Sequence, residues 1–245
     1  KDPATPSPSS QRQTVKQTIL NKRDITVLAL AIAAFTANAQ IISGPYLQNV
    51  SETGFTVVWD TKDTTLAWVE IAPDDGTHFY NTEREKIWET NLGRKKVGTL
   101  HVIEVSGLEP GSTWRYRALC SEVTAYDGNA KVIYGKTFGT DVYSKTPPAI
   151  TLPSRKKPST RFAVCNDIHA ANDKLRGLMA DAAGQNYDFV VFNGDLVSMM
   201  KSTEHIRESW LNSAAELFAD RIPLYVARGN HETRGVASTR FMEYF

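Results

Sequence analysis

Three short polar stretches hold the side chains that are best suited to chemistry in this chain of 245 residues. They read Asp167-Ile168-His169, Gly194-Asp195 and Gly229-Asn230-His231-Glu232. Carboxylate, imidazole and amide groups are ligands for metal ions. A lone aspartate has a simpler explanation, since it caps helices and sits in turns. All three stretches together, each directly after an apolar run, predict one metal site.

The elements that must position these groups alternate between strands and helices. The segments RFAVCND, YDFVVFNGD and IPLYVARGN are predicted strands, and residues 172–184 and 202–218 have apolar side chains at helical spacing. Apolar strands that alternate with amphipathic helices indicate a largely buried sheet covered by helices. Because sites in such sheets form at the carboxyl ends of the strands, we expect the three stretches to converge.

The segment from Gly44 to about Thr140 has a different rhythm, with short strands separated by turns. In FTVVWD, period-two spacing places Phe55, Val57 and Trp59 on one face, which is typical of an all-β sandwich. GLEPGSTWRYRAL resembles the E–F corner of fibronectin type III-like domains, with Trp114 at the usual tyrosine position. The histidines of this segment, His78 and His101, are isolated, and we expect surface or strand roles for them.

Residues 1–39 are predicted to be a leader and signal peptide. Lys22 and Arg23 precede a short apolar core, and Ala37-Asn38-Ala39 has the small-x-small pattern of a signal-peptidase site. The core is shorter than the roughly 20 residues that span a bilayer. We therefore expect an exported mature protein, periplasmic, cell-surface or extracellular, that begins near Gln40 and has no membrane span. The alternative is a buried helix of the folded protein.

Residues 141–160 are predicted to be a linker, because they contain four prolines and a basic triplet without periodicity. The whole chain is 41% hydrophobic with a formal charge of +1, which is globular composition. That charge indicates neither a nucleic-acid partner nor a membrane surface, and the oligomeric state is open. We expect Cys120 and Cys165 to be free buried thiols.

The pattern D-x-H, G-D, G-N-H-[ED] resembles that of the calcineurin-like metallophosphoesterase family. A fibronectin-like domain before it resembles the purple acid phosphatase-like branch, and GPYLQNVSETGFTVVWDT is similar in style. The resemblance covers about residues 41–245. It implies two domains: an all-β fibronectin III-like sandwich over 40–140, and an α/β metallophosphoesterase sandwich over 161–245, represented by its β-α-β-α-β portion.

The resemblance also implies a reaction, the hydrolysis of phosphate monoesters or diesters at a site with two divalent or trivalent metal ions. It implies that Asp195 bridges the ions, that Asp167 and His169 complete the first, and that Asn230 ligates the second through its amide oxygen. His231 is then expected to face the phosphate-ester substrate. It would stabilise the transition state or protonate the leaving oxygen.

Glu232 is expected to brace the turn that presents these groups. Ser198 stands where purple acid phosphatases have a tyrosine ligand to ferric iron, and His169 stands where they generally lack a histidine. Both departures point to the broader metallophosphoesterase pattern, and leave the metal open among iron, manganese and zinc.

The family completes its site with later histidines, whereas no histidine follows His231 here. We therefore expect an internal fragment of a longer gene product, weakly active or inactive by itself, with exposed apolar surface. A competing hypothesis is a secreted β-sandwich binding protein with a degenerate, non-catalytic phosphatase domain. A nucleotide-binding α/β domain is disfavoured because the sequence contains no GxxxxGK[ST] phosphate loop.

Overall fold

The computed structural model describes residues 40–128, 131–182 and 184–245. The predicted leader and signal peptide, residues 1–39, lie outside the described residues. Among the helices of residues 40–128, 131–182 and 184–245, none combines the length and the apolar character needed to cross a bilayer.

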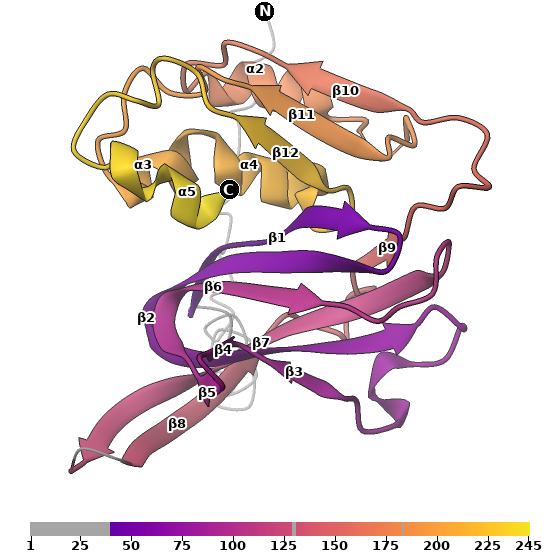
Figure 1. Cartoon of the computed structure of the whole chain (residues 1–245), viewed down its shortest axis with the longest axis vertical. Helices are drawn as coiled ribbons and strands as arrows, with labels where there is room; N and C mark the ends of the chain where they lie inside the picture. The colour runs from indigo at the N-terminus through magenta and orange to yellow at the C-terminus, as the bar shows by residue number, and fades with distance from the viewer. Residues whose placement is uncertain (1–39, 129–130, 183) are drawn as a thin grey trace, which may run out of the picture. The chain divides into compact units, whose positions relative to one another are not determined.

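Antiparallel strands make up the first part of the described chain (Figure 1). The strands are β1 (Ile41–Ser51), β2 (Gly54–Pro73), β3 (Lys86–Trp88), β4 (Thr90–Asn91), β5 (Arg94–Lys95), β6 (Val97–Val105), β7 (Thr113–Asp127), β8 (Lys131–Gly139) and β9 (Ala149–Thr151), with a short 3₁₀ turn η2 (Phe79–Asn81). Seven of them join in one sheet, and β4 and β5 form a separate pair. The β-rich character predicted for this part is confirmed.

The long strand β2 organises this sheet. Its first half pairs with β1 and β6, and its second half pairs with β7 and β3. The predicted inner face is confirmed, since Phe55, Val57 and Trp59 are at most 1% exposed. They form a core with residues of β1, β6, β7 and β9. At the corner, Trp114 Nε1 donates to Ser112 Oγ at 2.8 Å, a bond different from the one that a tyrosine hydroxyl would make.

Part of the predicted linker has regular structure. Strand β9 lies inside residues 141–160 and pairs antiparallel with β7, with Ile150 opposite Trp114. Ile150 is buried in the core of the sheet. The segment is therefore not a free connector over its whole length, because three of its residues add a strand.

The second part contains the predicted β-α-β-α-β order. Its elements are β10 (Phe162–Cys165), α2 (Asn172–Met179), β11 (Phe189–Asn193), α3 (Thr203–Ile206), η3 (Arg207–Leu211), α4 (Asn212–Ala214), η4 (Ala215–Ala219), β12 (Leu224–Ala227), η5 (Ser238–Arg240) and α5 (Phe241–Tyr244). The strands are parallel in the order β10-β11-β12. The second predicted helix runs without a break from α3 to η4, with two π-helical segments.

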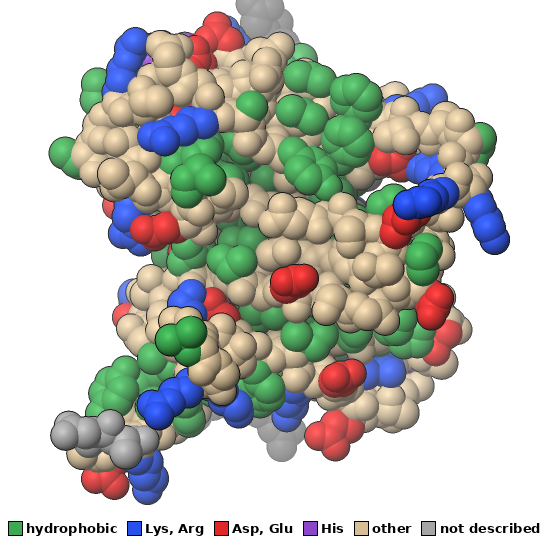
Figure 2. Space-filling model, viewed as in Figure 1, with side chains coloured by type: hydrophobic (Ala, Val, Ile, Leu, Met, Phe, Trp, Pro, Cys, Tyr) green, Lys and Arg blue, Asp and Glu red, His purple; other side chains and the backbone are tan. Residues whose placement is uncertain are grey.

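The two faces of this parallel sheet are in different environments. On one face, Phe192 packs against Trp210 and Phe218 of the helical segment, with ring centroids 4.6 and 6.4 Å away. On the opposite face, Phe162 and Val164 are 52% and 49% exposed. Figure 2 shows hydrophobic side chains at the surface over these strands. The predicted exposure of apolar surface is found at this face.

The β-rich and α/β parts pack against each other through β1 and β2. Tyr46 and Val58 are buried in the same core as the helices. A polar cluster extends the contact: Arg207 Nη1 and Tyr244 Oη donate to Asp60 Oδ2 at 3.2 and 2.8 Å. The described residues from 40 to 245 belong to one compact unit, so the division into two domains remains a prediction.

Candidate metal centre

The three predicted stretches begin where the three parallel strands end. β10 ends at Cys165, β11 at Asn193 and β12 at Ala227, and all three strands run in the same direction. Their carboxyl ends therefore share one edge of the sheet, where sites of α/β folds form. Two backbone hydrogen bonds continue the pairing past the strands, from Asp167 N to the Gly194 carbonyl at 3.2 Å and from His169 N to the Asp195 carbonyl at 3.0 Å.

The backbone at this edge is strained. Asp167, His169, Ala170 and Asp195 all have left-handed conformations, with φ of 55, 48, 60 and 54°. A residue with a Cβ atom pays a steric penalty there, on the order of 1 kcal/mol, that glycine avoids. Such strain persists only where surrounding contacts enforce it, and it gathers at functional sites. Three of the four are predicted metal ligands.

Two glycines allow the loops to approach each other. A Cβ atom on Gly229 would lie 2.3 Å from Asp195 Oδ1, and one on Gly194 would lie 2.8 Å from the Cα of Gly229. Side chains at either position would push the two loops apart. The glycines of the G-D and G-N-H stretches are thus required by close approach of backbone to backbone.

Glu232 ties the two loops together. Its side chain is 1% exposed. Oε2 accepts from the backbone nitrogens of Asp195 and Gly229 at 3.0 and 2.8 Å. Oε1 accepts from those of Leu196 and Val197 at 2.7 and 3.3 Å. These contacts are of the bracing kind predicted for Glu232, and they leave neither oxygen facing the site.

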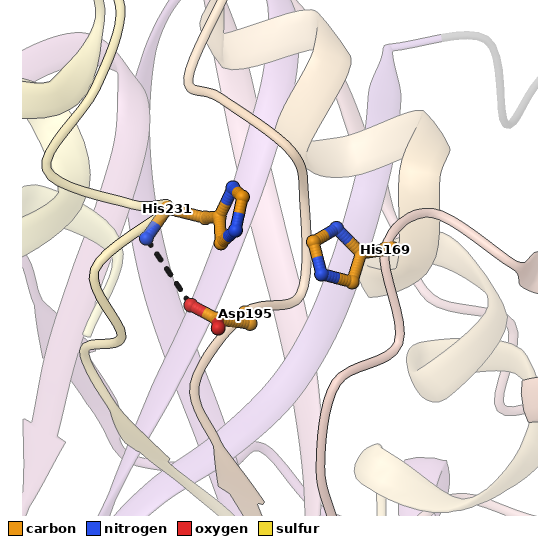
Figure 3. A group of neighbouring side chains, drawn as sticks. All are labelled: His169, Asp195 and His231. Carbon is orange, nitrogen blue, oxygen red and sulfur yellow. Dashed lines mark hydrogen bonds between the residues drawn. The ribbon is translucent and has the colours of Figure 1, made fainter.

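His169, Asp195 and His231 form the centre of the site (Figure 3). One potential ligand atom from each lies within 4.8 Å of those of the other two. The imidazole rings meet edge to face with centroids 4.6 Å apart, and His231 N donates to Asp195 Oδ1 at 3.1 Å. Asp167 Oδ1 is 2.9 Å from His169 Nε2. The stretches therefore converge, as their positions after the strands predict.

Ser198 contacts both imidazoles. Its hydroxyl oxygen is 3.2 Å from His169 Nδ1, and its carbonyl oxygen is 2.8 Å from His231 Nδ1. A carbonyl only accepts, so His231 Nδ1 carries a proton and Nε2 is the nitrogen left for a proton, an ion or a substrate. Arg234 Nη1 is 3.4 Å from the same Nδ1. An arginine nitrogen only donates, so with a proton on His231 Nδ1 this pair is a close contact and not a hydrogen bond.

Asn230 has two alternative amide orientations. With oxygen toward Asp195, acceptor faces acceptor, an arrangement that a cation between them would favour. With nitrogen toward Asp195, the amide donates to Oδ1 and Oδ2 at 3.2 and 3.1 Å, and its oxygen accepts from Arg234 Nη2 at 2.9 Å. The second orientation satisfies the hydrogen bonds of the protein atoms alone.

All of the predicted ligands lie at this edge of the sheet, but their roles remain predictions. His231 is predicted to face the substrate. One of its potential ligand atoms nevertheless lies within 4.8 Å of those of His169 and Asp195, so its position also suits a metal ligand. Ser198 was noted only as a departure from a family pattern, and Arg234 was not predicted to take part.

The donor set fits metal ions. The imidazole of His169 with carboxylate and amide oxygens suits iron, manganese or zinc, in contrast to the all-oxygen sites of calcium. The Asn230 amide oxygen could turn toward the Asp195 carboxylate, and a cation between the two groups would favour that orientation. The residues present therefore fit a metal site that includes Asp195.

Comparison with known proteins agrees with this geometry. Residues 160–245 match the family model of the calcineurin-like phosphoesterases, which confirms the resemblance expected from the sequence. No curated protein matches the chain. The solved structures that resemble it include purple acid phosphatase PPD1 from yellow lupin (Lupinus luteus) seeds, with 17% identity and a TM-score of 0.49 over 77% of this chain.

The chain spans 35% of that lupin enzyme. The third fibronectin III domain of the human KIAA0343 protein also resembles it, with 16% identity and a TM-score of 0.25, over 51% of this chain and 91% of that domain. At these levels of similarity neither structure assigns a function. The family model is the comparison that bears on the site, because its 86 residues include every predicted ligand.

Proposed function

We propose that this chain, whose residues 160–245 match the calcineurin-like phosphoesterases, is an exported metal-dependent phosphoesterase. It would hydrolyse phosphate monoesters or diesters at a site with two metal ions. The observation that carries this proposal is the convergence of His169, Asp195 and His231, whose ligand atoms lie within 4.8 Å of one another.

The residues would divide the binding between two ions. The Asp195 carboxylate is close to groups of both predicted sets: it clusters with His169, which contacts Asp167, and it lies 3.1 Å from the Asn230 amide. We assign Asp195 as the bridging carboxylate, Asp167 and His169 to the first ion, and Asn230 to the second. Bound ions would neutralise the charge of a phosphate ester and supply hydroxide near neutral pH.

His231 would act on the substrate. Its Nδ1 is held by the Ser198 carbonyl at 2.8 Å, which fixes the tautomer and the direction of the ring. Nε2 is then the nitrogen that can stabilise a phosphoryl oxygen or give a proton to the leaving oxygen. Glu232 keeps His231 in place indirectly, by fixing both loops.

The test combines metal binding with hydrolysis, on the complete reading frame expressed without residues 1–39. Metal content, metal-dependent melting temperature and hydrolysis of p-nitrophenyl phosphate and bis-p-nitrophenyl phosphate are measured for wild type and Asp195→Ala. Asp173→Ala is the matched control, since Asp173 is an exposed carboxylate in the same part of the chain. We expect the first variant to lose metal and turnover and the control to keep both.

A folded protein that takes up no metal and cleaves neither ester would contradict the proposal. That outcome would favour the alternative, a secreted β-sandwich binding protein with a non-catalytic phosphatase domain. Export is tested separately, by sequencing the N-terminus of protein made from the complete leader. We expect it near Gln40, and an intact leader on folded protein would contradict export.

A further inference from the structure

Arg234 places a guanidinium at the edge of the metal centre. Its Nη1 is 3.4 Å from His231 Nδ1, and its Nη2 is 2.9 Å from the Asn230 amide oxygen in the orientation that satisfies both groups. The Arg234 backbone is held at both ends, since its nitrogen donates to the His231 carbonyl and its carbonyl accepts from Met200 N at 2.8 Å. The backbone of Arg234 is thus held beside the site.

This guanidinium has no carboxylate partner among residues 40–128, 131–182 and 184–245. Several other arginines of the α/β part do have one, as Arg176 pairs with Glu216 at 2.6 Å and Arg240 with Glu243 at 2.6 Å. Arg234 is also exposed. Its charge and its donors are therefore available to a ligand.

We propose that Arg234 binds a terminal oxygen of the substrate and makes the site selective for phosphate monoesters. The proposal rests on the phosphoesterase function proposed above, and it names the class of ester. A guanidinium is planar, always charged, and matches phosphate oxygens with two parallel donors.

The expected selectivity for monoesters follows from the difference in oxygens and charge between the two kinds of ester. A monoester has three terminal oxygens and carries close to two negative charges at neutral pH, because its second pKa is about 6. A diester has two terminal oxygens and one charge. Groups that hold two oxygens serve both esters, whereas a cation placed for a third oxygen serves only the monoester. We assign this role to Arg234, because its guanidinium lies 3.4 Å from the imidazole that is expected to face the substrate.

Asn230 would link this anion site to the metal. Its amide oxygen is both the predicted metal ligand and the atom that Arg234 Nη2 holds at 2.9 Å. The oxygen cannot face Arg234 and an ion at Asp195 together. Metal binding that turns Asn230 would therefore release Arg234 toward the substrate, and phosphate should bind more tightly once metal is present.

The experiment compares Arg234→Ala and Arg234→Lys with Arg240→Ala, an exposed arginine of the same segment. The kcat/KM is measured with p-nitrophenyl phosphate and with bis-p-nitrophenyl phosphate. Binding of inorganic phosphate is measured by calorimetry, with and without metal. Melting temperatures check that each variant is folded.

We expect Arg234→Ala to lower kcat/KM for the monoester about 30-fold and for the diester no more than about 3-fold, from the usual strength of a hydrogen bond to a charged group. Phosphate affinity should fall about tenfold, with Arg234→Lys intermediate and Arg240→Ala unchanged. Equal losses for both esters would overturn the inference, as would unchanged phosphate affinity or a wild type that binds no phosphate. Phosphate binding that depends on Arg234 in a protein that cleaves neither ester would support the anion site and contradict the proposed function.

Discussion

Glu232 Oε1 lies 2.7 Å from the backbone nitrogen of Leu196, a residue 36 positions earlier in the chain. This contact joins the loop after β12 to the loop after β11. The same carboxylate also holds Gly229 N and Asp195 N through its other oxygen. One buried side chain thus sets the distance between two loops that carry the ligands.

Replacing Glu232 should therefore destabilise the fold as well as the site. Glu232→Gln keeps the shape of the side chain but turns an amide NH₂ toward backbone N–H donors. We expect the free energy of unfolding to fall by about 2–3 kcal/mol, because buried donors are left without a charged acceptor. Urea unfolding of this variant and of Glu216→Gln, an exposed glutamate, measures the difference. A loss as small as that of the control would show that the loops are held by other contacts.

Replacing His169 and replacing His231 should have different effects on metal content and on turnover. If His231 acts on substrate and His169 binds metal, His231→Ala should keep its metal content and lose at least about a hundredfold in turnover, the usual range for a general acid. His169→Ala should lose metal. Metal analysis beside the hydrolysis assay decides, with the exposed His78→Ala as control. Loss of metal from the His231 variant would make this residue a ligand.

The lowered pKa of Glu89 should make the stability of the β-rich part depend on pH. Burial by itself would raise the pKa of this carboxyl, but hydrogen bonds from His101 and Lys96 outweigh burial and leave the pKa below the usual 4.5. The contacts are short, with His101 Nδ1 and Lys96 Nζ each 2.7 Å from a Glu89 oxygen. A lowered folded-state pKa stabilises the protein above pH 4.5, and this contribution is lost as the pH falls through the folded-state pKa.

Glu89→Gln should accordingly cost about 2 kcal/mol at pH 7, and the difference from wild type should shrink as the pH falls below about 4.5. Urea unfolding at pH values from about 2.5 to 8 tests this. Glu104→Gln, on the exposed side of β6, should show little difference at any of these values. A gap between Glu89→Gln and wild type that stays constant with pH would contradict the assignment.

The contact between the two parts of the chain can be tested with a double-mutant cycle. Burial raises the pKa of Asp60 even though Tyr244 and Arg207 donate to its carboxylate. Its charge is thus costly to bury, so Arg207→Met should destabilise by about 3–5 kcal/mol by leaving that charge unpaired. Asp60→Asn together with Arg207→Met should recover most of the loss. Additive losses in urea unfolding would show that the two side chains are not coupled.

Much of the architecture follows from local patterns. Alternation in Phe55, Val57 and Trp59 predicts a strand with these three side chains in the core, which the structure has. The opposite face of this strand is buried as well, because Val58 packs in the core of the α/β part, and the alternation does not predict that contact. Strand β9 was missed because Ile150 lies between prolines, and only pairing with β7 makes those residues extended. The π-helical segments η3 and η4 have no sequence signal that distinguishes them from an α-helix.

The residues of the site also fall into those that the sequence predicts and those that it does not. Asp167, Asp195 and Asn230 could be proposed because each follows an apolar strand, and parallel strands bring such residues to one edge. The part played by Ser198 could not be predicted, since it contacts two histidines through atoms of different kinds. Arg234 could not be predicted either, because the absence of a charged partner is a property of the folded chain.

The left-handed backbone at the ligand loops has a consequence for anyone who would engineer this protein. A design that sought stability alone would place glycine at Asp167, His169, Ala170 and Asp195, because glycine adopts their conformation without a steric cost. At three of these positions the exchange would delete a group that the proposed chemistry needs. Only Ala170 is open to improvement. Among the described residues, Asn49, Leu92 and Asn186 share this conformation outside the site. Four of these seven residues thus gather at the ligand loops, where stability and the proposed chemistry make opposite demands on the sequence.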